Sequence, residues 1–109
     1  MAKAKSARAP KFQDQVKVDP THYKVEFENK QVRVLRINYG PHEKSVMHGH
    51  PAGVAVFLTD QRSKFTYPDG TSEEIVGEAG RARWLDAFQH LPENASDQPF
   101  ELILVELKT

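Results

Sequence analysis

Residues 64–76 read KFTYPDGTSEEIV, and this stretch decides the fold class. The segment 68–70, Pro-Asp-Gly, joins two runs of strand-forming residues at 64–67 and 71–76. Proline fixes φ at about −65° and glycine tolerates positive φ, as a tight reversal of an extended chain requires. The stretch therefore predicts an antiparallel β-hairpin.

The chain on both sides of this hairpin is also predicted to form short β-strands. Tyr23, Val25 and Phe27 alternate with charged residues, which is the period-two pattern of a strand with one buried face. Further strands are predicted at residues 32–39, 46–50, 53–59, 81–85 and 100–107. Gly, Pro and Asn separate the strands, with a predicted break at residues 92–94, and there is no helical periodicity of useful length. Short strands at this spacing indicate an all-β fold, a single antiparallel sandwich or β-barrel.

Length and composition predict the domain organisation. A chain of 109 residues without cysteine has the size of one domain and no disulfide framework, which favours a reducing cytoplasm. Residues 1–20 carry five Lys or Arg against Asp14 and Asp19, although the formal net charge of the chain is zero. We expect residues 1–20 to be a disordered basic tail and residues 21–109 to form the folded domain.

The same features exclude several classes of protein. No stretch approaches the roughly 20 apolar residues that span a bilayer, and no apolar signal-peptide core follows the basic N-terminus. The slightly acidic remainder of the chain argues against a nucleic-acid-binding barrel. We therefore expect a soluble protein that binds neither membrane nor nucleic acid.

Three histidines form the candidate site. His48 and His50 are two residues apart on a predicted strand, so their side chains leave the same face. His90 lies where the chain is expected to return across the barrel and supplies a third imidazole. Three neutral imidazoles on one side of a divalent metal leave positions open for water or substrate, which is typical of a working metal site.

The segments around these histidines resemble the two motifs of the cupin family. The first motif is a glycine, a short run, His-x-His, three or four residues and a glutamate, and here it reads Gly40-PHEKSVM-His48-Gly-His50-PAGVAVFLTD. The second ends in a histidine followed by an asparagine, and here it reads His90-LPE-Asn94. The resemblance covers residues 32–107 and implies a single antiparallel β-barrel, the double-stranded β-helix or jelly-roll-like fold.

The chain also departs from the cupin pattern. Val54 and Ala55 stand where the family places its metal-binding glutamate, so the resemblance implies a three-histidine variant of the site. The spacing from Gly40 to His48 is longer than in the family. Asp86-Ala87-Phe88 replaces the usual Pro-x-Gly turn before His90.

The resemblance implies three alternative functions. One is a non-haem, metal-dependent dioxygenase, since three-histidine sites without the glutamate are similar to those of β-diketone and cysteine dioxygenases. Loss of the carboxylate would attract a small anionic or enolisable substrate more strongly. The second is a non-catalytic small-molecule-binding cupin, and the third is a metal-independent isomerase or epimerase with a histidine base. A basic residue paired with a tyrosine in the pocket would favour the third.

The resemblance does not identify the metal, but it implies an oligomeric state. Three imidazoles suit Fe, Zn, Ni, Cu or Co. Small cupin barrels commonly pair through their sheets, so we expect a homodimer.

Other polar and aromatic residues are weaker candidates for the site. We expect His22 and His42 to be surface or core residues, with His42 the less favoured substitute ligand. Solvent exposure is expected for Glu93 and Glu106, and Asn94 is expected to hydrogen-bond the loop near His90. Aromatic residues that could line a pocket but are more typical of core are Tyr39, Phe57 and Trp84. Arginines that could hold a substrate carboxylate, although strand arginines usually face solvent, are Arg33, Arg36, Arg81 and Arg83.

Overall fold

The computed structural model describes residues 13–108, which fold as one short helix and nine strands. In chain order the elements are α1 (Gln15–Val18), β2 (Tyr23–Glu28), β3 (Val32–Tyr39), β4 (His48–His50), β5 (Gly53–Phe57), β6 (Gln61–Thr66), β7 (Ser72–Gly77), β8 (Ala82–Leu85), β9 (Phe88–Asn94) and β10 (Phe100–Leu107). Every ladder between these strands is antiparallel. The predicted all-β antiparallel fold is confirmed.

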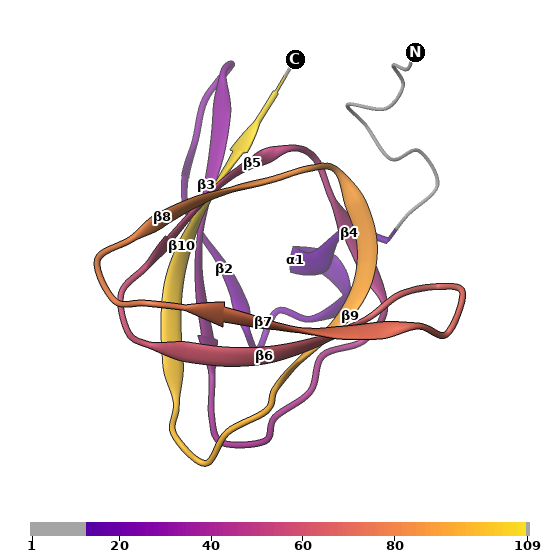
Figure 1. The fold of residues 1–109 in the computed structure, drawn as a ribbon. Helices are drawn as coiled ribbons and strands as arrows, with labels where there is room; N and C mark the ends of the chain where they lie inside the picture. Colours follow the sequence, from indigo (N-terminus) through magenta and orange to yellow (C-terminus); the bar gives the residue numbers. More distant parts are fainter. Residues whose placement is uncertain (1–12, 109) are drawn as a thin grey trace.

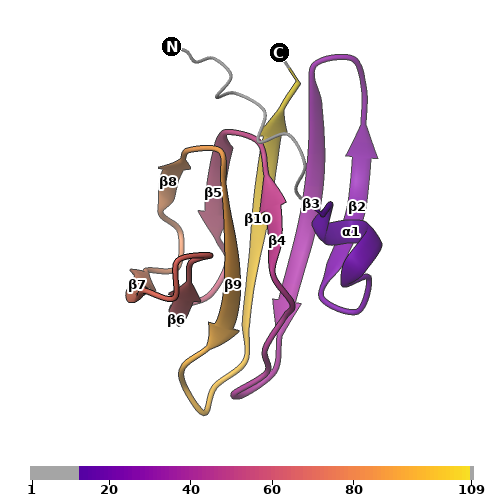
Figure 2. The same ribbon diagram turned by 90° about the vertical axis from the view of Figure 1, so that its right-hand side faces the viewer.

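The strands form two sheets that enclose a common interior (Figure 1). One sheet has the order β2-β3-β10-β5-β8 and the other has the order β4-β9-β6-β7. Seen from the side, the β4–β9 layer lies in front of β10 and β3 (Figure 2). Since consecutive strands in each sheet are rarely neighbours in sequence, the interior is assembled from distant parts of the chain.

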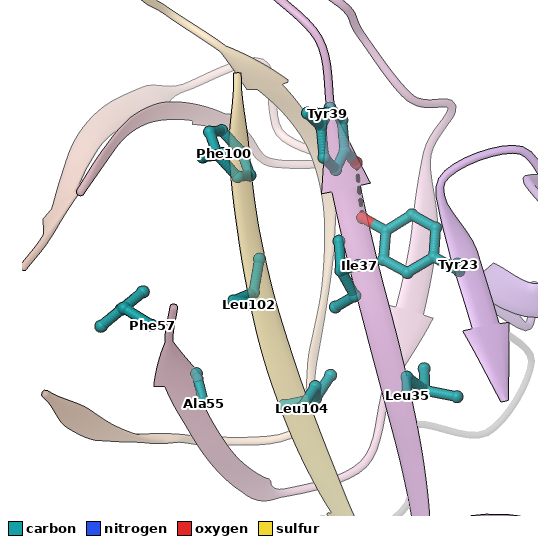
Figure 3. Close-up of a cluster of buried hydrophobic side chains, with 9 residues drawn as sticks. All are labelled: Tyr23, Leu35, Ile37, Tyr39, Ala55, Phe57, Phe100, Leu102 and Leu104. Atoms are coloured by element: carbon teal, nitrogen blue, oxygen red, sulfur yellow. Dashed lines mark hydrogen bonds between the residues drawn. The ribbon is translucent and has the colours of Figure 1, made fainter. Parts of the chain in front are cut away.

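Alternation along the strands places the apolar core between the two sheets. Buried and partly buried residues alternate without exception along β10 and along β5, so every second side chain faces inward. Figure 3 shows this cluster and the hydrogen bond between the hydroxyls of Tyr23 and Tyr39. Its members are Tyr23, Leu35, Ile37, Tyr39, Ala55, Phe57, Phe100, Leu102 and Leu104.

The predicted hairpin is present as β6 and β7. Gly70 has a φ of 89°, which a side chain would disfavour, and its N–H donates to the carbonyl of Tyr67 at 2.9 Å. The carboxylate of Asp69 accepts hydrogen bonds from the backbone and the hydroxyl of Thr71. The proline, aspartate and glycine of this turn therefore act as the sequence indicated.

The prediction of one buried face on β2 is wrong. A register irregularity between Val25 and Phe27 pairs Val25 with Leu35 and Phe27 with Val34, so the two side chains lie on opposite faces. β2 is also the edge of its sheet, and Val25 and Phe27 remain 43% and 56% exposed. The alternation in sequence could not reveal this bulge.

The predicted break at residues 92–94 is also wrong, because β9 continues through Pro92 to Asn94. The carbonyl of Pro92 accepts from the N–H of Ser45, and the N and O of one residue point to the same side of a strand. The missing N–H of Pro92 therefore faces the segment before β4, and the ladder to β6 loses no hydrogen bond.

The folded region begins earlier than residue 21. Gln15, in α1, is 1% exposed, and the N–H of Gly49 in β4 donates to the carbonyl of Gln13. The expectation of a disordered tail is therefore wrong for residues 13–20, while residues 1–12 lie outside the described part of the chain. No helix in residues 13–108 is long and apolar enough to cross a membrane.

Candidate functional site

The three predicted histidines lie together in the interior. β4 carries His48 and His50 on one face, and β9 places His90 directly opposite His48 in the antiparallel register. All three side chains are buried. The ring centroid of His90 lies 5.0 Å from that of His48 and 5.1 Å from that of His50. The two-residue spacing and the pairing of β4 with β9 therefore produce one histidine cluster.

The hydrogen bond of His50 fixes which ring nitrogen carries the proton. Its Nδ1 lies 2.9 Å from the carbonyl oxygen of Pro51, which can only accept a hydrogen bond. Nδ1 therefore carries the proton, and Nε2 has a free lone pair. This Nε2 is buried and has no hydrogen-bond partner among residues 13–108.

The hydrogen bonds of His48 also fix which ring nitrogen carries the proton, here through Ser45 and Asp19. Its Nδ1 lies 3.3 Å from the hydroxyl of Ser45, and that hydroxyl donates to the carboxylate of Asp19 at 2.6 Å. Burial opposes ionisation of Asp19, but hydrogen bonds from Ser45 and His22 outweigh it and hold its pKa below the usual range. Because the Ser45 proton is directed to Asp19, the Ser45 oxygen accepts from Nδ1 of His48. The lone pair of His48 is again on Nε2, which is buried without a partner within the described residues.

His90 completes the set of unsatisfied nitrogens. Its buried Nδ1 also lacks a hydrogen-bond partner in residues 13–108. Burial, followed by the charge of neighbouring histidines, lowers the pKa of His90 well below its ordinary value and that of His48 to about 4. Burial also lowers the pKa of His50. The cluster is therefore neutral at pH 7, which is the protonation state in which imidazole binds a metal.

The ring orientations are not those of a formed metal site. Among residues 13–108, no group of three or more His, Asp or Glu side chains is placed to hold a metal ion as the rings stand. The ring of His90 meets those of His48 and His50 edge to face, with interplanar angles of 90° and 71°. Rotation of the imidazole rings would be needed to direct three lone pairs at one ion.

The fourth position of the cupin pattern is apolar in space as well as in sequence. Ala55 faces the interior, where it pairs with Leu104, and Val54 lies on the other face of β5. Glu106 is buried, so its expected solvent exposure is wrong. It accepts hydrogen bonds from Arg33 and Gln15, and within residues 13–108 no histidine is hydrogen-bonded to it.

A small cavity adjoins the cluster between the two sheets. Its volume is about 50 Å³, which is room for a few water molecules or a very small ligand. Both sheets contribute to its wall, which includes His50, His90, Tyr23, Tyr39, Gln61 and Ser63 besides apolar residues. Gln15 from α1 also lines it, and sequence reasoning missed this residue because it precedes the expected start of the domain.

The remaining histidines lie outside the cluster. His22 hydrogen-bonds Asp19 and Glu43 through its two ring nitrogens at 2.7 and 3.0 Å and stacks on Tyr39 at 4.2 Å. His42 is exposed at a φ of 59°. Both match the expectation of core or surface residues. The contact of Asp19 with Ser45 joins residues 26 positions apart, and no pattern in the sequence signals it.

The side chain of Asn94 fixes the turn after β9 and not a loop that carries His90, because His90 lies within β9 itself. It donates to the carbonyls of Gly40 and Gln98 and accepts from Ser96. Since Gly40 follows β3 and Gln98 precedes β10, one amide ties both loops to the strand that carries His90.

No protein-family model and no curated protein matches the sequence. Solved structures with a similar fold do exist. A cupin domain from Bordetella pertussis has a TM-score of 0.73 at 24% identity, covering 80% of this chain and 92% of that one. A double-stranded β-helix protein from Klebsiella pneumoniae has a TM-score of 0.62 at 17% identity, covering 78% of this chain and 74% of that one. A polyketide cyclase from Streptomyces resistomycificus has a TM-score of 0.57 at 15% identity, covering 78% and 63%. At these identities the similarity concerns the fold alone.

Proposed function

Because this chain has the cupin fold, we propose that it binds one divalent metal ion through His48, His50 and His90 and acts on a small anionic or enolisable molecule. The observation that carries the proposal is the set of three buried imidazole nitrogens without a hydrogen-bond partner in the described residues. Buried polar atoms are rarely left unsatisfied, since each one costs roughly 1–3 kcal/mol. A cation shared by all three would remove that cost.

The residues around the cluster suit a neutral-histidine site. Pro51 and Ser45 hold the protons of His50 and His48 on Nδ1 and leave each Nε2 free to bind. Ala55 contributes no negative charge, so a bound divalent ion would keep its full charge and attract an anionic oxygen or sulfur. When bound, a ferrous ion would supply the redox chemistry of a dioxygenase, whereas zinc would supply a Lewis acid.

Metal analysis tests the ligand set. We predict that wild-type protein retains close to one equivalent of metal per chain after dialysis and that His50→Ala loses it. His42→Ala is the matched control, because His42 is exposed and outside the cluster. Far-UV circular dichroism should show that all three proteins are folded, since the apolar core does not include His50.

Equal metal content in wild type and His50→Ala would overturn the metal site. Oxygen consumption with a panel of 1,3-diketones and small thiols then tests the reaction class. Stoichiometric metal without oxygen consumption on any of them would leave a metal-binding cupin and remove the dioxygenase.

A metal-independent isomerase is the second candidate, and the tyrosines favour it. Tyr23 and Tyr39 line the same cavity as His50 and His90, and their hydroxyls hydrogen-bond each other at 2.5 Å. Burial raises the pKa of both phenols, so they stay protonated and could donate a proton while a neutral histidine accepts one. Activity that survives complete removal of metal by a chelator would favour this function.

A further inference from the structure

A second, larger hollow lies outside the histidine cluster, at the open edges of the two sheets. Its volume is about 440 Å³, and four strands or their ends line it. β7 and β8, the outermost strands of their respective sheets, both contribute to it. Its lining includes Phe65 and Tyr67 at the end of β6, Glu73 and Ile75 on β7, Arg83 and Leu85 on β8, and Phe88 on β9. We call this hollow the outer groove.

The strand register aligns the arginine of this groove with the side of the sheet that carries Ala55. Arg83 pairs with Ala55 and Leu85 pairs with Gly53, and cross-strand partners project from the same face of a sheet. Arg83 therefore projects from the same side of the sheet as Ala55, but because β8 is an edge strand it remains exposed, as expected of a strand arginine.

The outer groove is continuous with the histidine site. Phe65 and Leu85 line both the outer groove and the small inner cavity. The ring of Phe88 lies 4.7 Å from those of His50 and His90, and that of Phe65 lies 4.3 Å from His90. The two phenylalanines therefore form an apolar floor, with the imidazoles directly beneath.

Arg83 is the unpaired charge of the groove. It forms no ion pair with any carboxylate in residues 13–108. The two carboxylates of the groove already have neutral donors: Glu73 accepts from the Tyr67 hydroxyl at 2.7 Å, and Asp86 accepts from the indole N–H of Trp84 at 2.9 Å. The donors that remain unused in the groove are thus the five N–H groups of one guanidinium, whose planar fork matches a carboxylate.

We infer that the outer groove binds a small aromatic carboxylate, with its planar body against Phe65, Tyr67 and Phe88 and its carboxylate on Arg83. The opposite end of such a molecule would reach toward His50 and His90. This inference deepens the proposed function by naming the substrate class of that site, while the contact with Arg83 itself needs no metal. Aromatic faces favour stacked or edge-on contact with a planar ligand, which gives the groove its preference for an unsaturated ring.

Binding of benzoate and cinnamate to the full chain tests the inference. Trp84 is the single tryptophan of the protein and lines the outer groove, so its fluorescence reports occupancy, and calorimetry gives the Kd. We expect both acids to bind, benzylamine to bind at least roughly 10-fold more weakly, and cyclohexanecarboxylate to bind more weakly than benzoate. Arg83→Gln should weaken benzoate binding roughly 10-fold or more, because a charge-assisted bidentate hydrogen bond is lost.

Arg81→Gln is the matched control, since Arg81 is an exposed arginine close by that does not line the groove. It should leave the Kd for benzoate unchanged. No measurable binding of either acid, tighter binding of benzylamine, or equal affinities of Arg83→Gln and wild type would each overturn the inference.

Each measurement is made on chelator-treated and metal-loaded protein to separate this inference from the proposed function. Binding that depends on Arg83 in both preparations supports the groove whatever the metal does. Stoichiometric metal on His48, His50 and His90 without benzoate binding would overturn the groove and leave the metal site standing.

Discussion

Asp19 determines which ring nitrogen of His48 carries the proton, although it acts only through the hydroxyl of Ser45. The Asp19 carboxylate takes the proton of Ser45, so the hydroxyl oxygen faces Nδ1 of His48 as an acceptor. His22 hydrogen-bonds the same carboxylate oxygen of Asp19 through Nδ1 and hydrogen-bonds Glu43 through Nε2. A polar chain therefore runs from the partly exposed Glu43 to the buried histidine cluster. Orientation of a metal-ligating histidine by such outer partners raises its affinity for the ion.

The buried histidines make the metal-free protein sensitive to acid. The pKa of His48 falls from 6.5 to about 4 in the folded state, chiefly through burial. Between these values the unfolded chain binds a proton that the folded chain does not, so stability is full above pH 6.5 and is lost as the pH falls toward 4. We predict that His48 alone lowers the free energy of unfolding of metal-free protein by about 3 kcal/mol across this range.

Urea unfolding at pH 6.5, 5.5 and 4.5 measures this loss. His48→Gln should show a shallower decline than wild type, and His42→Gln should show the wild-type decline because His42 is exposed. Carboxylates titrate in all three proteins, so only the difference between variants reports His48. Parallel declines in His48→Gln and wild type would contradict the prediction.

At the scale of the element, β5 shapes the interior because two of its residues, Gly53 and Ala55, have small side chains or none. Ala55 leaves the histidine site without a carboxylate, and Gly53 lets β5 approach β10 closely. A Cβ built on Gly53 would lie 2.1 Å from the backbone oxygen of Val105. Because that contact is with backbone, no side-chain movement can relieve it.

We predict that Gly53→Ala destabilises the protein by about 1–3 kcal/mol through separation of β5 from β10. Urea denaturation provides the measurement. Gly40→Ala is the control, since its Cβ would meet only the flexible carboxyl end of Glu43 at 3.0 Å, and it should cost less than about 1 kcal/mol. Equal stability of Gly53→Ala and wild type would show that β5 and β10 can move apart freely.

At the scale of the whole molecule, three edge strands, β2, β7 and β8, have no second neighbouring strand within residues 13–108. β7 and β8 form one open side, where the outer groove lies, and β2 is an edge of the five-stranded sheet. The apolar side chains of Val25 and Phe27 are exposed on β2. An exposed apolar edge strand offers unpaired backbone groups to a second copy of the chain.

We predict a homodimer that forms through β2. Light scattering should give twice the chain mass, and Phe27→Lys should give the monomer mass, because a charge on the β2 edge opposes pairing. Val76→Lys is the control: Val76 is 62% exposed on β7 in the other sheet and should not change the mass. Wild-type protein at the monomer mass over a wide concentration range would exclude this assembly.

The sequence by itself determined the features that depend on local chemistry. The turn at Pro68, Asp69 and Gly70 was predictable because proline and glycine restrict or free φ regardless of surroundings. The common face of His48 and His50 follows from the period of an extended chain. The strand at residues 100–107 was found with its exact ends, because a short run rich in Leu, Ile and Val favours an extended strand.

Only the tertiary structure decided the features that depend on which strands become neighbours. Phe27 changed face because a bulge against β3 changed its register, and Pro92 stayed in a strand because its missing N–H faces no ladder. Gln15 and Glu106 became buried partners across 91 positions of the chain, and Arg83 came to lie beside Ala55 through the pairing of β8 with β5. Propensity and periodicity act over a few residues, whereas burial, pairing and the partners of a polar group are set by contacts between segments that the sequence keeps far apart.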